Sequence, residues 1–226
     1  MGQYYKAYVK NDKEKVYNAQ NAMYLTVMGL ESSDRLTDGY KVEGFWGYFS
    51  GIKLTEHSWT VNDFCNGVIE QIWDKPSKVA WVGDYANEPN DFNDAYTEAV
   101  YETVWGNYRK NKEAIPSSPF SYAPHIHEAG WLINHTKGVY LCLSDYVIVS
   151  SEPPRSGGYR WCLHPLPLLT CIGNGRGGGD YHGTNMGKVG SWAMDEIEYT
   201  LDIDKLKDFS ALAARDYRFI EGKEQW

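Results

Sequence analysis

The feature that most restricts how this chain can fold is a glycine-rich run at residues 172–183, with the sequence IGNGRGGGDYHG. Five of the seven residues from 173 to 179 are glycine. Glycine loses more backbone freedom on folding than any other residue, so such a run is a costly way to make a turn. The run makes sense where backbone N–H groups must crowd a ligand, or where φ must be positive repeatedly. The apolar residues 166–171 before it predict a short buried segment that brings the run to one place.

The spacing of the glycines alone does not identify a known nucleotide fold. Gly173, Gly175 and Gly178 match the dinucleotide pattern G-x-G-x-x-G, but residues 179–183 are a poor helix start, and that pattern requires a helix. What remains is a nest of backbone N–H groups that binds an anion, with Arg176 as the charged donor. The alternative is a loop that needs glycine only to pack beneath aromatic side chains.

Composition narrows the class of protein. The 226 residues are 42% hydrophobic and 23% charged, which is ordinary for a globular protein able to bury a core. The net charge is −8, and no basic block is longer than residues 109–112. Affinity for duplex nucleic acid or for an anionic membrane surface is therefore not expected, because both need clustered cations.

The sequence predicts a cytoplasmic protein with reduced thiols. Residues 1–6 carry no apolar signal region, and no run of about 18 apolar residues occurs. The four cysteines form no C-x-x-C pair and lie in hydrophobic contexts, which favours buried free thiols over disulfides.

Hydrophobic periodicity predicts one α+β domain over residues 1–226, with a mostly antiparallel sheet and two main helices. The helices are expected at about 61–73 and 91–112, where apolar residues recur every three or four positions. Strands are expected at 3–9 and 16–17 as a hairpin, at 78–82, at 131–134 and 139–143 as a second hairpin, and at 192–199.

Three further residues have the chemistry of acids or bases. They are His57 within Glu56-His57-Ser58-Trp59, His164 just before Pro165, and Asp180 in the glycine-rich run. A polar helix entry, in which His57 is bonded to the backbone, is the favoured interpretation of that stretch. The pair His125 and His127 resembles a metal motif, but no third ligand is nominated by the spacing, so no metal and no cofactor are predicted.

Several phrases of the chain resemble an uncharacterised protein family of phages and gut-type bacteria. These phrases are MGQYYK at 1–6, EHSW at 56–59, VAWVGDYA at 79–86, NHTK at 134–137, HPLPLLT at 164–170 and GNGRGGGDY at 173–181. The resemblance implies a phage or bacterial cytosolic setting. It implies no activity and adds no catalytic residue.

Together these patterns favour a binding protein for a small anionic, nucleotide-like ligand, such as a phage-encoded protein that sequesters a host defence signal. Arg176 would meet the phosphate, and Tyr181, Trp81 or Trp192 would stack on a base or sugar. The predicted ligand-binding residues are Asn174, Gly175, Arg176, Gly177, Gly178, Gly179, Tyr181, Trp81, Asp84 and Trp192.

Two other classes stay open from the sequence. One is a hydrolase of a phosphate ester or glycosidic bond in such a ligand, with His57, His164 and Asp180 as acid and base groups. The other is a phage structural or protein-interaction protein that uses its aromatic surface. A homo-oligomer is compatible with any of them.

Overall fold

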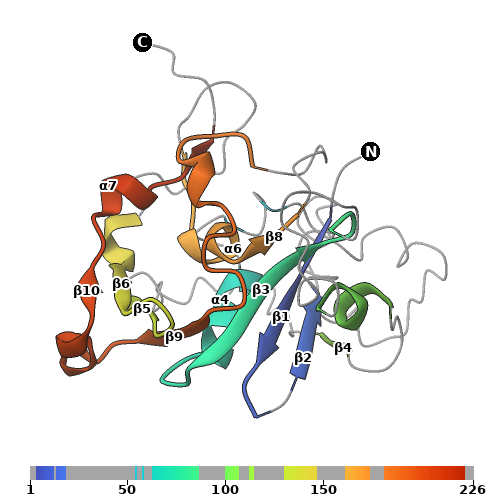
Figure 1. Cartoon of the computed structure of the whole chain (residues 1–226), viewed down its shortest axis with the longest axis horizontal. Coiled ribbons are helices and arrows are strands. Elements are labelled where there is room, and N and C mark those ends of the chain that lie inside the picture. The colour runs from blue at the N-terminus through green and yellow to red at the C-terminus, as the bar shows by residue number, and fades with distance from the viewer. Residues whose placement is uncertain are drawn as a thin grey trace, which may run out of the picture.

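The computed structural model describes residues 4–12, 14–18, 54, 58, 63–86, 100–106, 112–114, 130–146, 161–173 and 181–221. Within these ranges one mixed sheet of nine strands dominates (Figure 1). Its strands are β1 (Tyr5–Lys10), β2 (Glu14–Asn18), β3 (Ser77–Gly83), β4 (Lys112–Ala114), β5 (Trp131–Asn134), β6 (Val139–Cys142), β8 (Cys171–Ile172), β9 (Glu196–Thr200) and β10 (Ser210–Ala211).

The strand order is β10-β6-β5-β9-β3-β1-β2-β4, and β8 also pairs with β3. The pairs β1–β2, β1–β3, β3–β9, β5–β6 and β5–β9 are antiparallel. The pairs β2–β4, β3–β8 and β6–β10 are parallel. A small second sheet joins β7 (Trp161–Cys162) to β11 (Ile220–Glu221). The predicted α+β fold with a mostly antiparallel sheet is confirmed.

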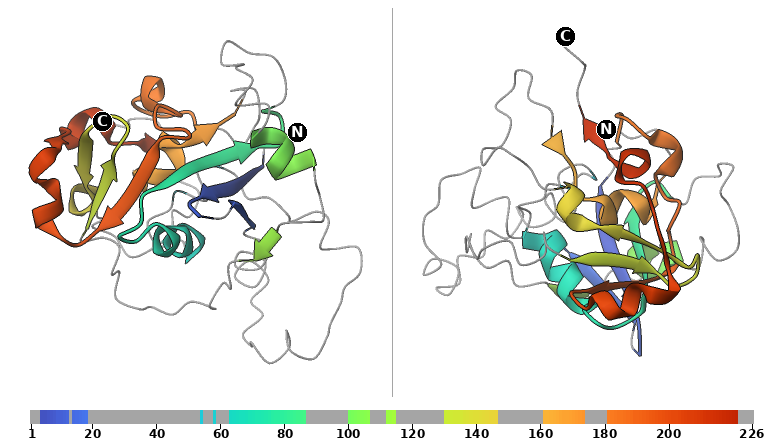
Figure 2. Two further views of the ribbon diagram at one scale, coloured as in Figure 1. Left: turned by 60° about the horizontal axis from the view of Figure 1, so that its bottom comes forward. Right: turned by 90° about the vertical axis from the view of Figure 1, so that its left-hand side faces the viewer.

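Short helices connect and cover these strands (Figure 2). Among the described residues, three are α-helices: α4 (Asp63–Gln71), α6 (Pro165–Leu169) and α7 (Ala214–Tyr217). A π-helical turn, η1 (Glu102–Gly106), follows Val100 and Tyr101. The 3₁₀ turns in the same described ranges are η3 (Leu143–Tyr146), η4 (Met186–Lys188) and η5 (Ile203–Asp208).

Strand alternation divides the buried side chains between two cores, one on each face of the central strands. Tyr5, Ala7 and Val9 of β1 enter the larger core, where α4 and α6 contribute most of the helical side chains. Tyr8, one position out of phase, enters the smaller core beneath residues 100–106. Because successive residues of a strand point to opposite faces, β1 and β3 are buried on both sides.

Most predicted elements form close to where the sequence places them. Both hairpins are present, and α4 lies within the predicted helix 61–73. Of the predicted helix 91–112, Val100 and Tyr101 are helical, Glu102–Gly106 form a π-helical turn and Lys112 already belongs to β4, whereas residues 91–99 and 107–111 lie outside the described residues. Of the predicted strand 192–199, residues 192–195 form a turn in which Met194 has φ 63°, and β9 begins only at Glu196.

Candidate functional site

The carboxyl ends of two parallel strands meet at one end of the sheet. In the β3–β8 ladder Trp81 is opposite Cys171, and Val82 is opposite Ile172. The chain leaves β3 through Gly83 and Asp84, and it leaves β8 through Gly173, where the glycine-rich run starts. The arrows of β3 and β8 point the same way in both Figures 1 and 2. In open α/β sheets, ligands bind beside the loops that follow the carboxyl ends of parallel strands, and the β3–β8 pair has the same local arrangement.

A buried ammonium group lies in the same row of the sheet. Lys6 of β1 is opposite Val82, which is opposite Ile172 of β8. Residues opposite one another in a ladder share a face, so the Lys6 side chain points to the side of the smaller core. Lys6 has no exposed surface, and its Nζ lies 3.6 Å from the centroid of the Trp105 ring.

Two aromatic side chains of the segment 100–106 bind the end of β3. Trp105 Nε1 donates a hydrogen bond to the Val82 carbonyl (3.1 Å), and Tyr101 OH donates to the Asp84 carbonyl (3.1 Å). They are four residues apart and hence lie on one face of the helical turn. Burial raises the pKa of Tyr101, and the charges of Asp84 and Glu102 add to the effect. The phenol therefore stays a hydrogen-bond donor at neutral pH.

Asp84 is held by the amino end of β1. Its Oδ1 accepts a hydrogen bond from the Tyr4 amide (3.0 Å), and its own amide donates to the Tyr4 carbonyl (2.9 Å). Asp84 is partly exposed, so its carboxylate remains close to solvent. We call Lys6, Asp84, Tyr101, Trp105 and Gly173 the sheet-end cluster. It combines a cation, a carboxylate and two aromatic groups beside the start of a glycine-rich run.

Most of the site residues predicted from the sequence do not belong to this cluster. Asp84 belongs to it. Eight others lie outside the described residues: His57, Asn174, Gly175, Arg176, Gly177, Gly178, Gly179 and Asp180. Trp81, Tyr181 and Trp192 are at most 1% exposed and pack in the larger core. Tyr181 donates its OH to the Thr184 carbonyl (2.7 Å) and meets Phe219 edge to face. These positions favour a packing role, and stacking on a ligand would require the core to open.

His164 caps a helix. Its backbone is extended (φ −62°, ψ 128°), as expected for a residue before proline. Its Nδ1 accepts a hydrogen bond from the Leu166 amide (3.1 Å), and its own amide donates to the Ser58 carbonyl (2.6 Å). Because Nδ1 accepts, the neutral ring carries its proton on Nε2. In this arrangement His164 can donate a hydrogen bond through Nε2, but its Nδ1 lone pair is used by the Leu166 amide, so the ring is placed neither as a general base nor as a general acid.

Sequence reasoning missed Lys6, Tyr101 and Trp105. The burial of Lys6 could have been predicted from the neighbouring strand. Strand β3 is apolar at every position from 79 to 82, which is typical of a strand covered on both faces. A lysine on the neighbouring strand is then buried on whichever face it points to. Tyr101 and Trp105 could be placed only once the segment 100–106 was known to cover the smaller core.

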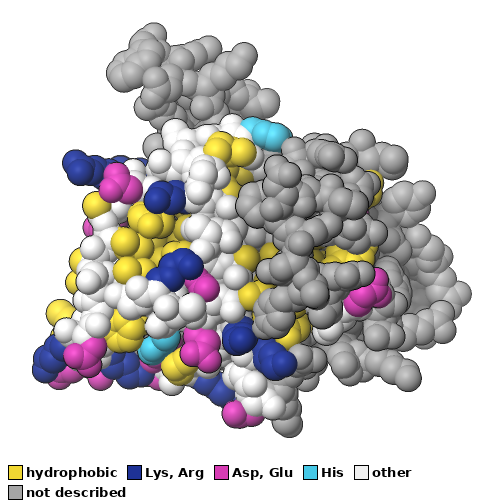
Figure 3. All heavy atoms as spheres, in the orientation of Figure 1, with side chains coloured by type: hydrophobic (Ala, Val, Ile, Leu, Met, Phe, Trp, Pro, Cys, Tyr) yellow, Lys and Arg dark blue, Asp and Glu magenta, His cyan; other side chains and the backbone are white. Residues whose placement is uncertain are grey.

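A second polar cluster, the β9 network, lies far from the sheet-end cluster. Glu198 of β9 is 3% exposed and contacts His135 Nε2 through Oε2 (2.7 Å) and Lys205 Nζ through Oε1. Lys205 also reaches Asp74 (2.8 Å), which accepts a further hydrogen bond from Thr200 (2.6 Å). Charged side chains of both signs gather at the lower left of Figure 3, over η5.

The contacts of the β9 network stabilise the fold. Hydrogen bonds from Lys205 and then Thr200 lower the pKa of Asp74, and they outweigh burial. Burial alone would lower the pKa of Lys205. Its hydrogen bonds to Asp74 and Glu198 have a larger combined effect, so the pKa is raised. Oppositely charged groups that satisfy one another in this way tie η5 to β9 and to the turn before β3. The pKa shifts of Asp74 and Lys205 arise from contacts within the protein, so no bound ligand is required to explain them.

Within the described ranges, no group of three or more His, Cys, Asp or Glu side chains is placed to hold a metal ion. The pair His125 and His127 lies outside those ranges. Cys65, Cys142 and Cys171 form no disulfide within the described part of the chain. None of the described helices is both long and apolar enough to cross a membrane.

Comparison of the chain with family models, with curated proteins and with solved structures gives no match.

Proposed function

We propose that the protein binds a small anionic, nucleotide-like ligand at the carboxyl ends of β3 and β8. The observation that carries this proposal is the parallel register of Val82 with Ile172, which brings the start of the glycine-rich run next to the Gly83–Asp84 turn. Glycine-rich segments after such strands can present several N–H groups to one anion. The buried ammonium of Lys6 lies in the same row and adds positive charge to that end of the sheet.

Residues 174–180 connect Gly173 to Tyr181, and the structure describes both of these end residues. Gly173 follows β8 directly, and Tyr181 is fixed by its hydrogen bond to Thr184 and its contact with Phe219. The connection carries Arg176, whose guanidinium can bind a phosphate through two parallel hydrogen bonds. In this proposal Arg176 and the surrounding N–H groups hold the anionic group of the ligand.

The resemblance to a phage and gut-bacterial family implies that this binding would take place in the bacterial cytosol. A protein that captures a nucleotide-derived signal in the bacterial cytoplasm needs binding but no turnover. We therefore favour sequestration over catalysis, which also fits the capping role of His164. The proposal makes no use of a metal or a cofactor.

Isothermal titration calorimetry with a panel of nucleotides tests the proposal, and native mass spectrometry of the same protein shows its oligomeric state and any retained ligand. Arg176→Ala should weaken binding of the retained nucleotide by about 10- to 150-fold, which corresponds to the loss of one charge-assisted hydrogen bond of about 1.5–3 kcal/mol.

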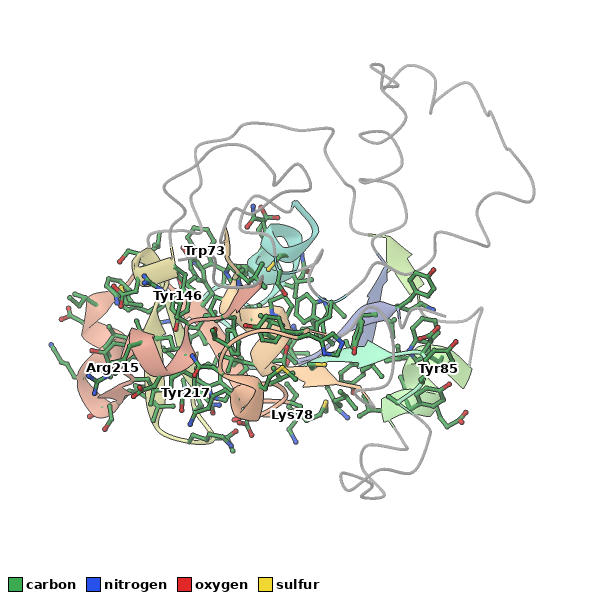
Figure 4. All side chains as sticks on the ribbon, turned by 90° about the horizontal axis from the view of Figure 1, so that it is seen from above. Trp73, Lys78, Tyr85, Tyr146, Arg215 and Tyr217 are labelled. Atoms are coloured by element: carbon green, nitrogen blue, oxygen red, sulfur yellow. The ribbon has the colours of Figure 1, made fainter. Side chains whose placement is uncertain are left out.

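The matched control is Arg215→Ala. Arg215 is 87% exposed and pairs with its neighbour Asp216, and it lies at the opposite end of the structure from Tyr85 (Figure 4). This control should bind like the wild type. If no nucleotide binds the wild type, or if both variants bind equally well, the proposed function is wrong.

A further inference from the structure

We draw no further inference here: the strongest candidate, the surface patch formed by the exposed side chains of Leu201 and Ile203 between β9 and η5, carries nothing because nothing in the described part of the structure shows what covers it.

Discussion

The imidazole of His135 lies within hydrogen-bond distance of the carboxylate of Glu198, with Nε2 2.7 Å from Oε2. Glu198 is almost fully buried, and its other oxygen accepts a hydrogen bond from Lys205. Each oxygen of a buried carboxylate thus has a nitrogen partner. Phe209 supports the imidazole from the side with an edge-to-face contact. A buried charge is tolerated when it is paired in this way, so removing a partner should be costly.

Lys205→Met should therefore destabilise the protein by about 1–3 kcal/mol. This is less than the 3–5 kcal/mol typical of a fully buried pair, because the Lys205 side chain is 35% exposed and solvent screens its charge. Lys207→Met is the matched control from the same turn. Its ion pair with Asp204 is exposed on both sides, so it should change stability by less than about 0.5 kcal/mol. Urea unfolding at neutral pH measures both, and equal losses would contradict the assignment.

Asp74 should make stability depend on pH in the acid range. Hydrogen bonds from Lys205 and Thr200 lower its folded-state pKa below the ordinary 3.8. The carboxylate then contributes stability above its unfolded pKa, and that contribution is lost as pH falls through the folded value. The stability difference between the wild type and Asp74→Asn should shrink between about pH 5 and about pH 2. Asparagine also tolerates the left-handed backbone at this position (φ 50°), so the variant isolates the charge.

Urea unfolding at a series of pH values tests this expectation. A constant difference between the two proteins over the acid range would show that the pairing of Asp74 does not contribute through its charge.

The fold was predictable where local pattern decides it. The β5–β6 hairpin follows from two apolar runs around a short turn, in which Gly138 has φ 66°. Helix α4 follows from its apolar stripe, whose residues Cys65, Val68, Ile69 and Ile72 are all buried. The pairing of β8 with β3 was not predictable, because it joins two-residue stretches some ninety positions apart in the chain. No local pattern encodes such a contact.

The candidate site was predictable only in part for the same reason. The glycine-rich run and Asp84 are visible in the sequence as polar loops after apolar strands. The aromatic residues of the cluster could not be predicted, because nothing in the sequence distinguishes the environment of Trp81 from that of Trp105. Trp81 alternates into the larger core, whereas Trp105 reaches the end of β3 only through the helical turn that carries it.

Tyr199 should make stability fall in the alkaline range. Burial, followed by the charge of Asp74, raises its pKa from 10.0 to about 12. A raised folded-state pKa contributes stability that is fully present below the unfolded value and is lost as pH rises through the folded value. The wild type should therefore lose stability between pH 10 and about 12 more steeply than Tyr199→Phe. The raised pKa of Lys205 acts in the same direction in both proteins, so their difference isolates the phenol.

Unfolding curves of both proteins, recorded alongside tyrosinate absorbance, provide the measurement. Parallel loss of stability in the wild type and Tyr199→Phe would show that the phenol ionises alike in the folded and unfolded chains.

Gly138 and Gly190 offer a matched pair of substitutions that differ only in the space around them. Both have positive φ, at 66° and 74°, where a side chain costs about 1–2 kcal/mol. A Cβ on Gly138 would meet no atom within 4 Å, whereas one on Gly190 would lie 2.6 Å from the Cys171 carbonyl oxygen. Gly138→Ala should therefore lose about 1 kcal/mol, and Gly190→Ala should lose about 1–3 kcal/mol more. Urea unfolding compares them, and equal losses would contradict the crowding at Gly190.

The same pair tests whether β8 positions the site. Gly190 donates its amide to the Leu168 carbonyl and packs against Cys171, the β8 residue opposite Trp81. A methyl group there must displace Cys171, and with it Gly173 and the start of the glycine-rich run. Gly190→Ala that remains folded should therefore bind the nucleotide identified with the panel more weakly than the wild type, while Gly138→Ala, in a distant hairpin, should bind it equally well. Unchanged affinity for that nucleotide in folded Gly190→Ala would mean that the position of β8 does not control binding.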